Sequence, residues 1–119
     1  MSSEFKLFPE EFDPFGRGAH EPGSKLDATK PNCDLVFSGF NRALLEVARV
    51  GTYGATKYTE NGWKDVPNGI QRYRSAIYRH MLSNEYVDPE SRMFHMAQVA
   101  WNALAVLELM MCEAEDPTI

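Results

Sequence analysis

The chain has 119 residues, a formal net charge of −5 and an apolar fraction of 44%. This length allows one domain with a modest core. Lysines and arginines are scattered, which excludes the basic stripe expected of a nucleic-acid-binding surface. An acidic protein can still hold a small anion through a few placed cations or a divalent metal.

The absence of a recognisable targeting signal and the spacing of the cysteines predict a cytoplasmic protein that does not cross a membrane. The start, MSSEFKLFPEEF, lacks the basic and apolar regions of a signal peptide. The longest window without charge, 93–107, is too short to span a bilayer and contains polar side chains. Cys33 and Cys112 lie far apart without a CxxC pattern, so we expect two buried free thiols.

The sequence divides into an arm, residues 1–34, and a helical domain, residues 35–119. Four of the seven prolines lie in the arm together with several glycines, which excludes a long helix there. Phenylalanines in MSSEFKLFPEEFDPF predict that this extended N-terminal arm packs along the domain or along a neighbouring subunit.

Three helices are expected in the domain. A stripe at i, i+3, i+7 spacing, running from Phe37 to Gly51, predicts a first helix over 35–53. A turn-rich loop over 54–68 follows, and loops of this length are often functional. The second helix is predicted over 69–84, with His80 on its apolar face.

The third helix is predicted over 89–113, with Asp88 as its N-cap and Pro89 at its first position. Its apolar residues extend nearly all the way round, so the helix should be covered on every side. Three helices of one small chain cannot easily cover it. Oligomerisation is therefore expected.

Acidic residues supply candidate metal ligands. Glu85-x-x-Asp88 offers two carboxylates of the kind that hold Mg²⁺ or Mn²⁺, although Asp88 could be only an N-cap and Glu85 only solvated. Glu46 lies at the edge of the first helix's stripe between Arg42 and Arg49. It could be a ligand or a member of an ordinary surface ion-pair ladder.

Polar residues on apolar helix faces are further candidates. His95, Gln98 and Asn102 form a stripe at i, i+3, i+7. An interhelical hydrogen-bond network is the favoured interpretation for Gln98 and Asn102, whereas His95 could equally contact a ligand. An inward histidine such as His80 is more often structural than catalytic.

The loop after the first helix carries the parts needed to hold a triphosphate and stack on a base. These are Lys57, Asn61 and Trp63, with Lys30 and Arg79 as further cations. Trp63 could instead plug the core. No P-loop, nucleophile elbow or HExxH motif occurs, so metal-assisted attack by water is the reaction class these residues best support.

Several segments together resemble a known family. GSKLDATKP, ALLEVARVGTYGATKYTENGW, RYRSAIYRHML and EYVDPES occur in this order, followed by His95. They resemble the phage-type dATP/dGTP diphosphohydrolases, small MazG-like proteins. The resemblance implies an all-α NTP pyrophosphohydrolase, usually oligomeric, that uses Mg²⁺ or Mn²⁺ to convert a (d)NTP to the monophosphate and pyrophosphate. MazG proteins carry an ExxE motif and an ExxD motif. Glu85 and Asp88 match the ExxD motif, whereas only Glu46 matches the ExxE motif, because Arg49 stands three residues after it.

The combined prediction is a small MazG-like helical bundle completed by oligomerisation, as a dimer or homotetramer. It would hydrolyse a purine nucleotide, preferentially dGTP, and feed phage 2-aminoadenine synthesis in the host cytoplasm. The resemblance implies metal binding by Glu46, Glu85 and Asp88, with His80 or His95 completing or orienting the site, and a spare carboxylate accepting the proton of water. The alternatives are a nucleotide-sensing module without hydrolysis and a structural helical oligomerisation protein.

Overall fold

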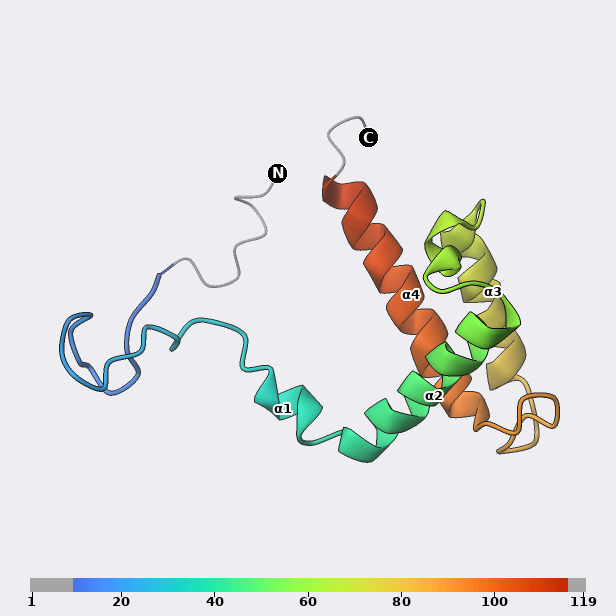
Figure 1. Cartoon of the computed structure of the whole chain (residues 1–119), viewed down its shortest axis with the longest axis horizontal. Coiled ribbons are helices and arrows are strands. Elements are labelled where there is room, and N and C mark those ends of the chain that lie inside the picture. The colour runs from blue at the N-terminus through green and yellow to red at the C-terminus, as the bar shows by residue number, and fades with distance from the viewer. Residues whose placement is uncertain (1–9, 116–119) are drawn as a thin grey trace. The chain divides into compact units, whose positions relative to one another are not determined.

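The computed structural model describes residues 10–115; residues 1–9 of the expected arm and residues 116–119 lie outside this range. The described part contains four α-helices and one 3-10 helix (Figure 1): α1 (Asp34–Phe37), α2 (Asn41–Lys57), η2 (Gly62–Asp65), α3 (Gly69–Met81) and α4 (His95–Glu115). Within it, strand-like pairing is limited to one isolated bridge between Val87 and Phe94. The predicted all-α class is confirmed.

The described residues separate into two compact units, with the division after Gly39. In the N-terminal unit the carboxylate of Asp13 is buried and accepts three backbone hydrogen bonds. Its Oδ2 accepts from the amides of Phe15 (2.9 Å) and Arg17 (3.0 Å), and its Oδ1 from that of Lys25 (3.1 Å). The bonds from Arg17, Lys25 and Phe15 hold the pKa of Asp13 below its ordinary value. This carboxylate therefore closes a loop in the expected arm.

The predicted first helix, 35–53, is wrong in its bounds. The chain leaves helical geometry between α1 and α2, and α2 continues to Lys57. The hydroxyl of Ser38 donates to the carbonyl of Asp34 at 2.6 Å, and Gly39 follows. A hydroxyl that bonds locally and a glycine both weaken a helix. The apolar stripe that predicted a single helix is therefore divided between α1 and α2, although the stripe itself has no gap.

In the second unit α2 and α3 both pack against α4, and η2 contacts α3 and α4 (Figure 1). Helix α3 begins at Gly69 as predicted and ends at Met81, three residues before the predicted end. The buried apolar side chains are Val50 of α2 with Ala97 and Ala105 of α4. Small residues at these positions let the helices approach closely.

The predicted start of the third helix is also wrong, because α4 begins at His95. The chain folds back before it: the amide of Asp88 donates to the carbonyl of Met93 at 2.8 Å, and Arg92 has a positive φ of 64°. The carboxylate of Asp88 accepts from the amide of Glu90 at 3.0 Å. Asp88 thus closes a turn seven residues before the first residue of α4 and does not cap that helix.

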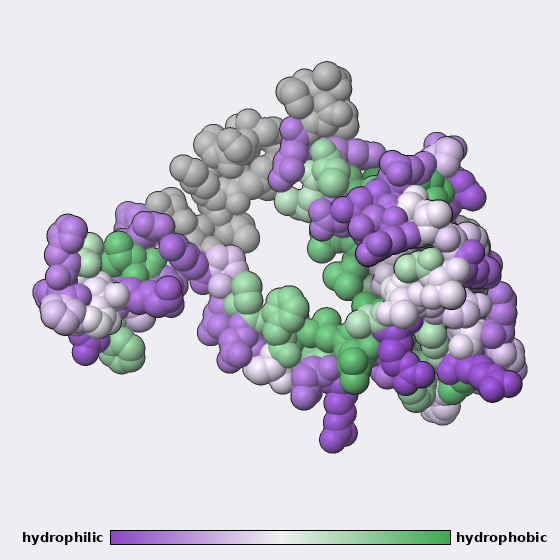
Figure 2. Space-filling view, viewed as in Figure 1, coloured by the Kyte–Doolittle hydropathy of each residue, from purple (hydrophilic) through white to green (hydrophobic). Residues whose placement is uncertain are grey.

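Large hydrophobic side chains remain exposed on the second unit. Figure 2 shows hydrophobic surface over α2 and α4, and Leu45, Leu104 and Leu107 are each more than half exposed. Both cysteines are free and exposed, so the expectation of buried thiols is wrong. Among the described helices, none combines the length and the apolar run needed to cross a bilayer.

Candidate active site

A large cavity opens in the second unit. It is lined by α2, the segment carrying η2, α3, the turn before α4 and α4 itself, and its volume is about 1060 Å³. Small-molecule sites in proteins usually occupy about 300–1,000 Å³. The cavity therefore has room for a ligand of the size of a nucleotide.

Charged side chains of both signs line this cavity. The cations are Lys57, Arg72 and Arg79, and the carboxylates are Glu60, Asp88 and Glu90. The Nζ of Lys57 lies 3.1 Å from Oε1 of Glu90, and this hydrogen bond raises the pKa of Lys57 above its ordinary 10.5. Lys57 is thus charged at neutral pH. Guanidinium and ammonium groups are the side chains that bind phosphates, so the cavity offers a polyphosphate several cations.

The cavity collects most of the residues that the sequence singled out. Seven of the predicted site residues line it: Lys57, Asn61, Trp63, Arg79, His80, Asp88 and His95. They come from five separate segments of the chain.

The other three predicted site residues do not line the cavity. Glu46 is paired with Arg49 at 3.5 Å on the surface of α2, which is the ion-pair alternative. Glu85 is exposed. Lys30 belongs to the N-terminal unit, where its Nζ lies 3.4 Å from Oε1 of Glu11.

The predicted metal ligands are not brought together. No group of three or more His, Cys, Asp or Glu side chains able to hold a metal ion occurs among residues 10–115. Asp88 alone of the predicted set lines the cavity, and its Oδ1 and Oδ2 already accept from Glu90 N (3.0 Å) and Ser91 Oγ (3.1 Å). Mg²⁺ is commonly bound by one or two carboxylates plus substrate phosphates. Of the three predicted ligands, the described residues thus place only Asp88 where it could share a divalent ion with the phosphates of a substrate.

His80 and His95 form a pair in the cavity wall. Their Nδ1 atoms are 2.8 Å apart and their ring centroids 5.1 Å apart. Burial lowers the pKa of His80 below its ordinary 6.5, the neighbouring His95 and Arg79 act in the same direction, and Asp88 opposes them. His80 is therefore neutral at neutral pH.

Trp63 belongs to an aromatic cluster in the cavity wall. Its ring meets those of Trp101 and Tyr73 edge to face, with centroids 5.6 Å and 6.3 Å away. The hydroxyl of Tyr73 donates to the carbonyl of Trp63 at 2.7 Å. Trp63 therefore packs in this cluster, which is one of the two roles that the sequence suggested for it. It also lines the cavity.

Gln98 and Asn102 are hydrogen-bonded, but the bonds lie within α4 and to the turn before it, and not between helices as their spacing predicted. The amide of Asn102 donates to the carbonyl of Gln98 at 2.8 Å, and the amide of Gln98 donates to the hydroxyl of Ser91 at 3.4 Å. Because Ser91 also bonds Asp88, this network ties α4 to the turn that carries Asp88.

Sequence reasoning missed Arg72 and Ser91 as cavity residues. A signal for Arg72 was present, since it lies seven residues before Arg79 and residues seven apart share a helix face. Ser91 had no such signal, because its position depends on the turn that replaces the expected start of the third helix.

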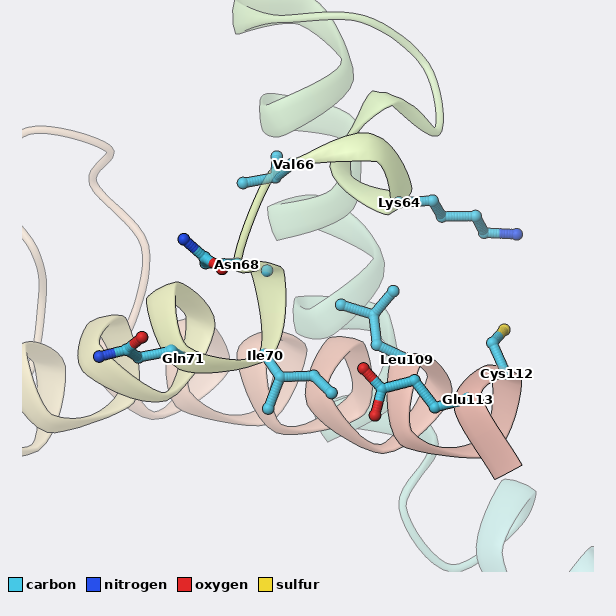
Figure 3. A pocket seen from close by; sticks show the side chains of 9 residues that line it. Lys64, Val66, Asn68, Ile70, Gln71, Leu109, Cys112 and Glu113 are labelled. Atoms are coloured by element: carbon cyan, nitrogen blue, oxygen red, sulfur yellow. The ribbon is translucent and has the colours of Figure 1, made fainter. Parts of the chain in front are cut away.

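A second, shallower cavity of about 560 Å³ lies at the C-terminal end of α4 (Figure 3). Lys64 of η2, Ile70 and Gln71 of α3, and Leu109 and Glu113 of α4 line it. The larger cavity therefore remains the candidate active site, since it contains the histidine pair and most of the predicted residues.

A compact helical unit with a cavity lined by cations is suited to binding an anionic metabolite such as a nucleotide. The sequence profile of the family described as "dATP/dGTP diphosphohydrolase, N-terminal" matches residues 20–117. The chain belongs to this family, whose description indicates a hydrolase that acts on nucleotides. Neither the curated proteins nor the solved structures contain a match.

Proposed function

We propose that the large cavity hydrolyses dGTP to dGMP and pyrophosphate, with GTP and dATP as possible further substrates. The family match over residues 20–117 carries this proposal. The activity would reside in the helical domain, 35–119, with residues 1–34 as an accessory arm.

The lining of the cavity supports a polyphosphate substrate. Lys57, Arg72 and Arg79 offer positive charge to the phosphates, and charge placed where pyrophosphate departs would stabilise the leaving group. Trp63 and Asn61 are the candidates for contacting the base. Mg²⁺ or Mn²⁺ would enter on the triphosphate and offset its charge.

We further propose a cellular role, because the overall sequence pattern resembles that of MazZ, an enzyme of bacteriophages that replace adenine with 2-aminoadenine. The product dGMP would supply that pathway in the cytoplasm of the host. The enzyme would act as a homodimer or homotetramer, because hydrophobic side chains of α2 and α4 are exposed in one chain.

The direct test is to incubate the protein with each dNTP and with GTP, in Mg²⁺ and in Mn²⁺, and to measure pyrophosphate release. We expect release from dGTP to exceed that from the pyrimidine nucleotides. Release of single phosphate, or no turnover of any nucleotide, would contradict the proposal.

A pair of arginines on α3 supplies a matched test of the cavity. Arg79 lines the cavity, whereas Arg74 is exposed on the same helix. Arg79→Gln should raise the KM for dGTP about tenfold or more, since a hydrogen bond to a charged group contributes about 1.5–3 kcal/mol. Arg74→Gln should leave the KM unchanged; equal effects of both variants would argue against phosphate binding at this cavity.

The two predicted carboxylates outside the cavity need their own test. Glu46→Gln and Glu85→Gln should each abolish turnover, with an unchanged circular dichroism spectrum, if the family-like roles assigned to them hold. Full activity of either variant would remove that residue from the site.

One observation favours a second candidate function. The described residues contain no cluster of three metal-ligating side chains, which suits a nucleotide-sensing module that binds without hydrolysis. A nucleotide that raises the melting temperature without being turned over would support the sensor, since a ligand that binds only the folded state stabilises it.

A further inference from the structure

The histidine pair of the cavity defines which nitrogen atoms carry protons. His80 and His95 are joined by an Nδ1 to Nδ1 hydrogen bond of 2.8 Å. In such a bond one nitrogen must carry the proton and the other must be bare. Two neutral arrangements satisfy this bond. In each, one ring carries its proton on Nδ1 and has a bare Nε2, while the other ring carries its proton on Nε2.

Burial of His95 favours one of these arrangements. Nε2 of His95 is buried and has no hydrogen-bond partner among the described residues. In folded proteins a buried N–H without an acceptor is rarer than an acceptor that lacks a donor. The proton of His95 is therefore better placed on Nδ1, from which it donates to Nδ1 of His80.

The same hydrogen bond fixes the proton of His80. Its Nδ1 accepts the proton of His95 Nδ1, so Nε2 is the nitrogen that carries the proton of the neutral His80 ring. The Nδ1–Nδ1 contact and the buried, unpartnered Nε2 of His95 together assign both tautomers.

We propose that His80 donates its Nε2–H to a phosphate oxygen of the bound nucleotide, and that His95 is the positioning residue that fixes this tautomer. The proposal rests on the proposed function and names a new contact in the same cavity. Both histidines line that cavity together with Lys57 and Arg79, whose charges attract the same phosphates. A neutral imidazole adds a hydrogen-bond donor there without adding a buried charge.

Nuclear magnetic resonance of the full chain tests the tautomers directly. Long-range proton–nitrogen correlation spectra at pH 7.5 should show His80 protonated at Nε2 and His95 protonated at Nδ1. The reverse assignment, or a doubly protonated ring, would overturn the proposal. The third histidine, His20, lies in the other unit and provides the internal reference.

The donor role is tested by three variants assayed with dGTP and Mg²⁺. His80→Phe removes the donor and should lower kcat/KM about 10- to 100-fold, the range expected for a hydrogen bond to a charged group, whereas His80→Gln keeps an N–H and should retain much of the activity. His95→Phe keeps a ring but cannot fix the tautomer. It should lower kcat/KM and return His80 to a mixture of tautomers in the spectrum.

The control is His20→Gln, which should leave both kcat and KM unchanged. Unchanged activity of His80→Phe would overturn the donor role even with the expected tautomers. If wild-type protein turned over no nucleotide, the proposed function would fail and the donor role with it. An active wild type with the wrong tautomers or insensitive variants would refute this inference alone.

Discussion

The histidine pair makes the stability of the fold depend on pH. The pKa of His80 is lowered in the folded state, by burial first and then by its positive neighbours. Between the folded pKa and 6.5 the unfolded chain binds more protons, so stability rises with pH in this window. The contribution is complete above pH 6.5 and is lost as the pH falls toward the folded pKa.

We therefore expect the free energy of unfolding to fall between pH 7 and pH 5.5, as measured by urea denaturation. His80→Gln should flatten this dependence, because glutamine does not titrate. His20→Gln should preserve the slope of the wild type. A slope that persists in His80→Gln would assign the dependence to other groups.

Asp88 shows how far a residue's local chemistry can be inferred from sequence. An aspartate before a proline predicts a helix N-cap, and the side chain of Asp88 does accept a hydrogen bond from the backbone amide two residues later. The same bond closes an Asx turn. Sequence therefore predicted the hydrogen bond but not the element it belongs to, since the positive φ of Arg92 and the pairing of Val87 with Phe94 decide where α4 begins.

Helix α2 illustrates the same limit for elements. The sequence predicts a loop that begins at Gly54, yet this residue lies inside α2, which ends at Lys57. Glycine lowers helix propensity, but packing of α2 against α4 outweighs that cost. Gly51 has a role in this packing, because a methyl group there would lie 3.4 Å from Nε1 of Trp101.

These two glycines give a matched prediction for the stability of α2. A methyl group at Gly54 would meet no atom within 4 Å, so Gly54→Ala should stabilise the fold by about 0.5–1 kcal/mol through helix propensity. Gly51→Ala should gain less, because its methyl group would press on Trp101. Thermal and urea unfolding measure the difference; an equal gain at both positions would show that the Trp101 contact is unimportant.

At the scale of the whole molecule, the sequence predicts a third helix whose apolar residues extend nearly all the way round. The all-α class followed from helical periodicity, and the apolar residues around the third helix predicted exposed hydrophobic surface. The structure leaves Leu104, Leu107 and Met111 of α4 about half exposed. The sequence singles out many of the residues that line the cavity, but it does not predict the shape of the cavity, because the walls depend on how three helices pack.

These three side chains lie at i, i+3 and i+7, so they form one stripe along α4. Fully burying a leucine contributes about 1.5–3 kcal/mol, and a second copy that buried the stripe would gain part of this at each position. We expect the wild-type chain to associate in solution. Light scattering after size exclusion should give a multiple of the mass of one chain.

Charge on the stripe tests which surface is responsible. Leu104→Glu combined with Leu107→Glu should reduce the assembly to single chains, because a carboxylate without a partner is costly to bury. Leu82→Glu is the matched control, since Leu82 follows α3 and is 82% exposed. A monomeric wild type would contradict assembly itself. An assembly that survives both changes on α4 would place the interface elsewhere, and the exposed side chains of α2 would be its next candidates.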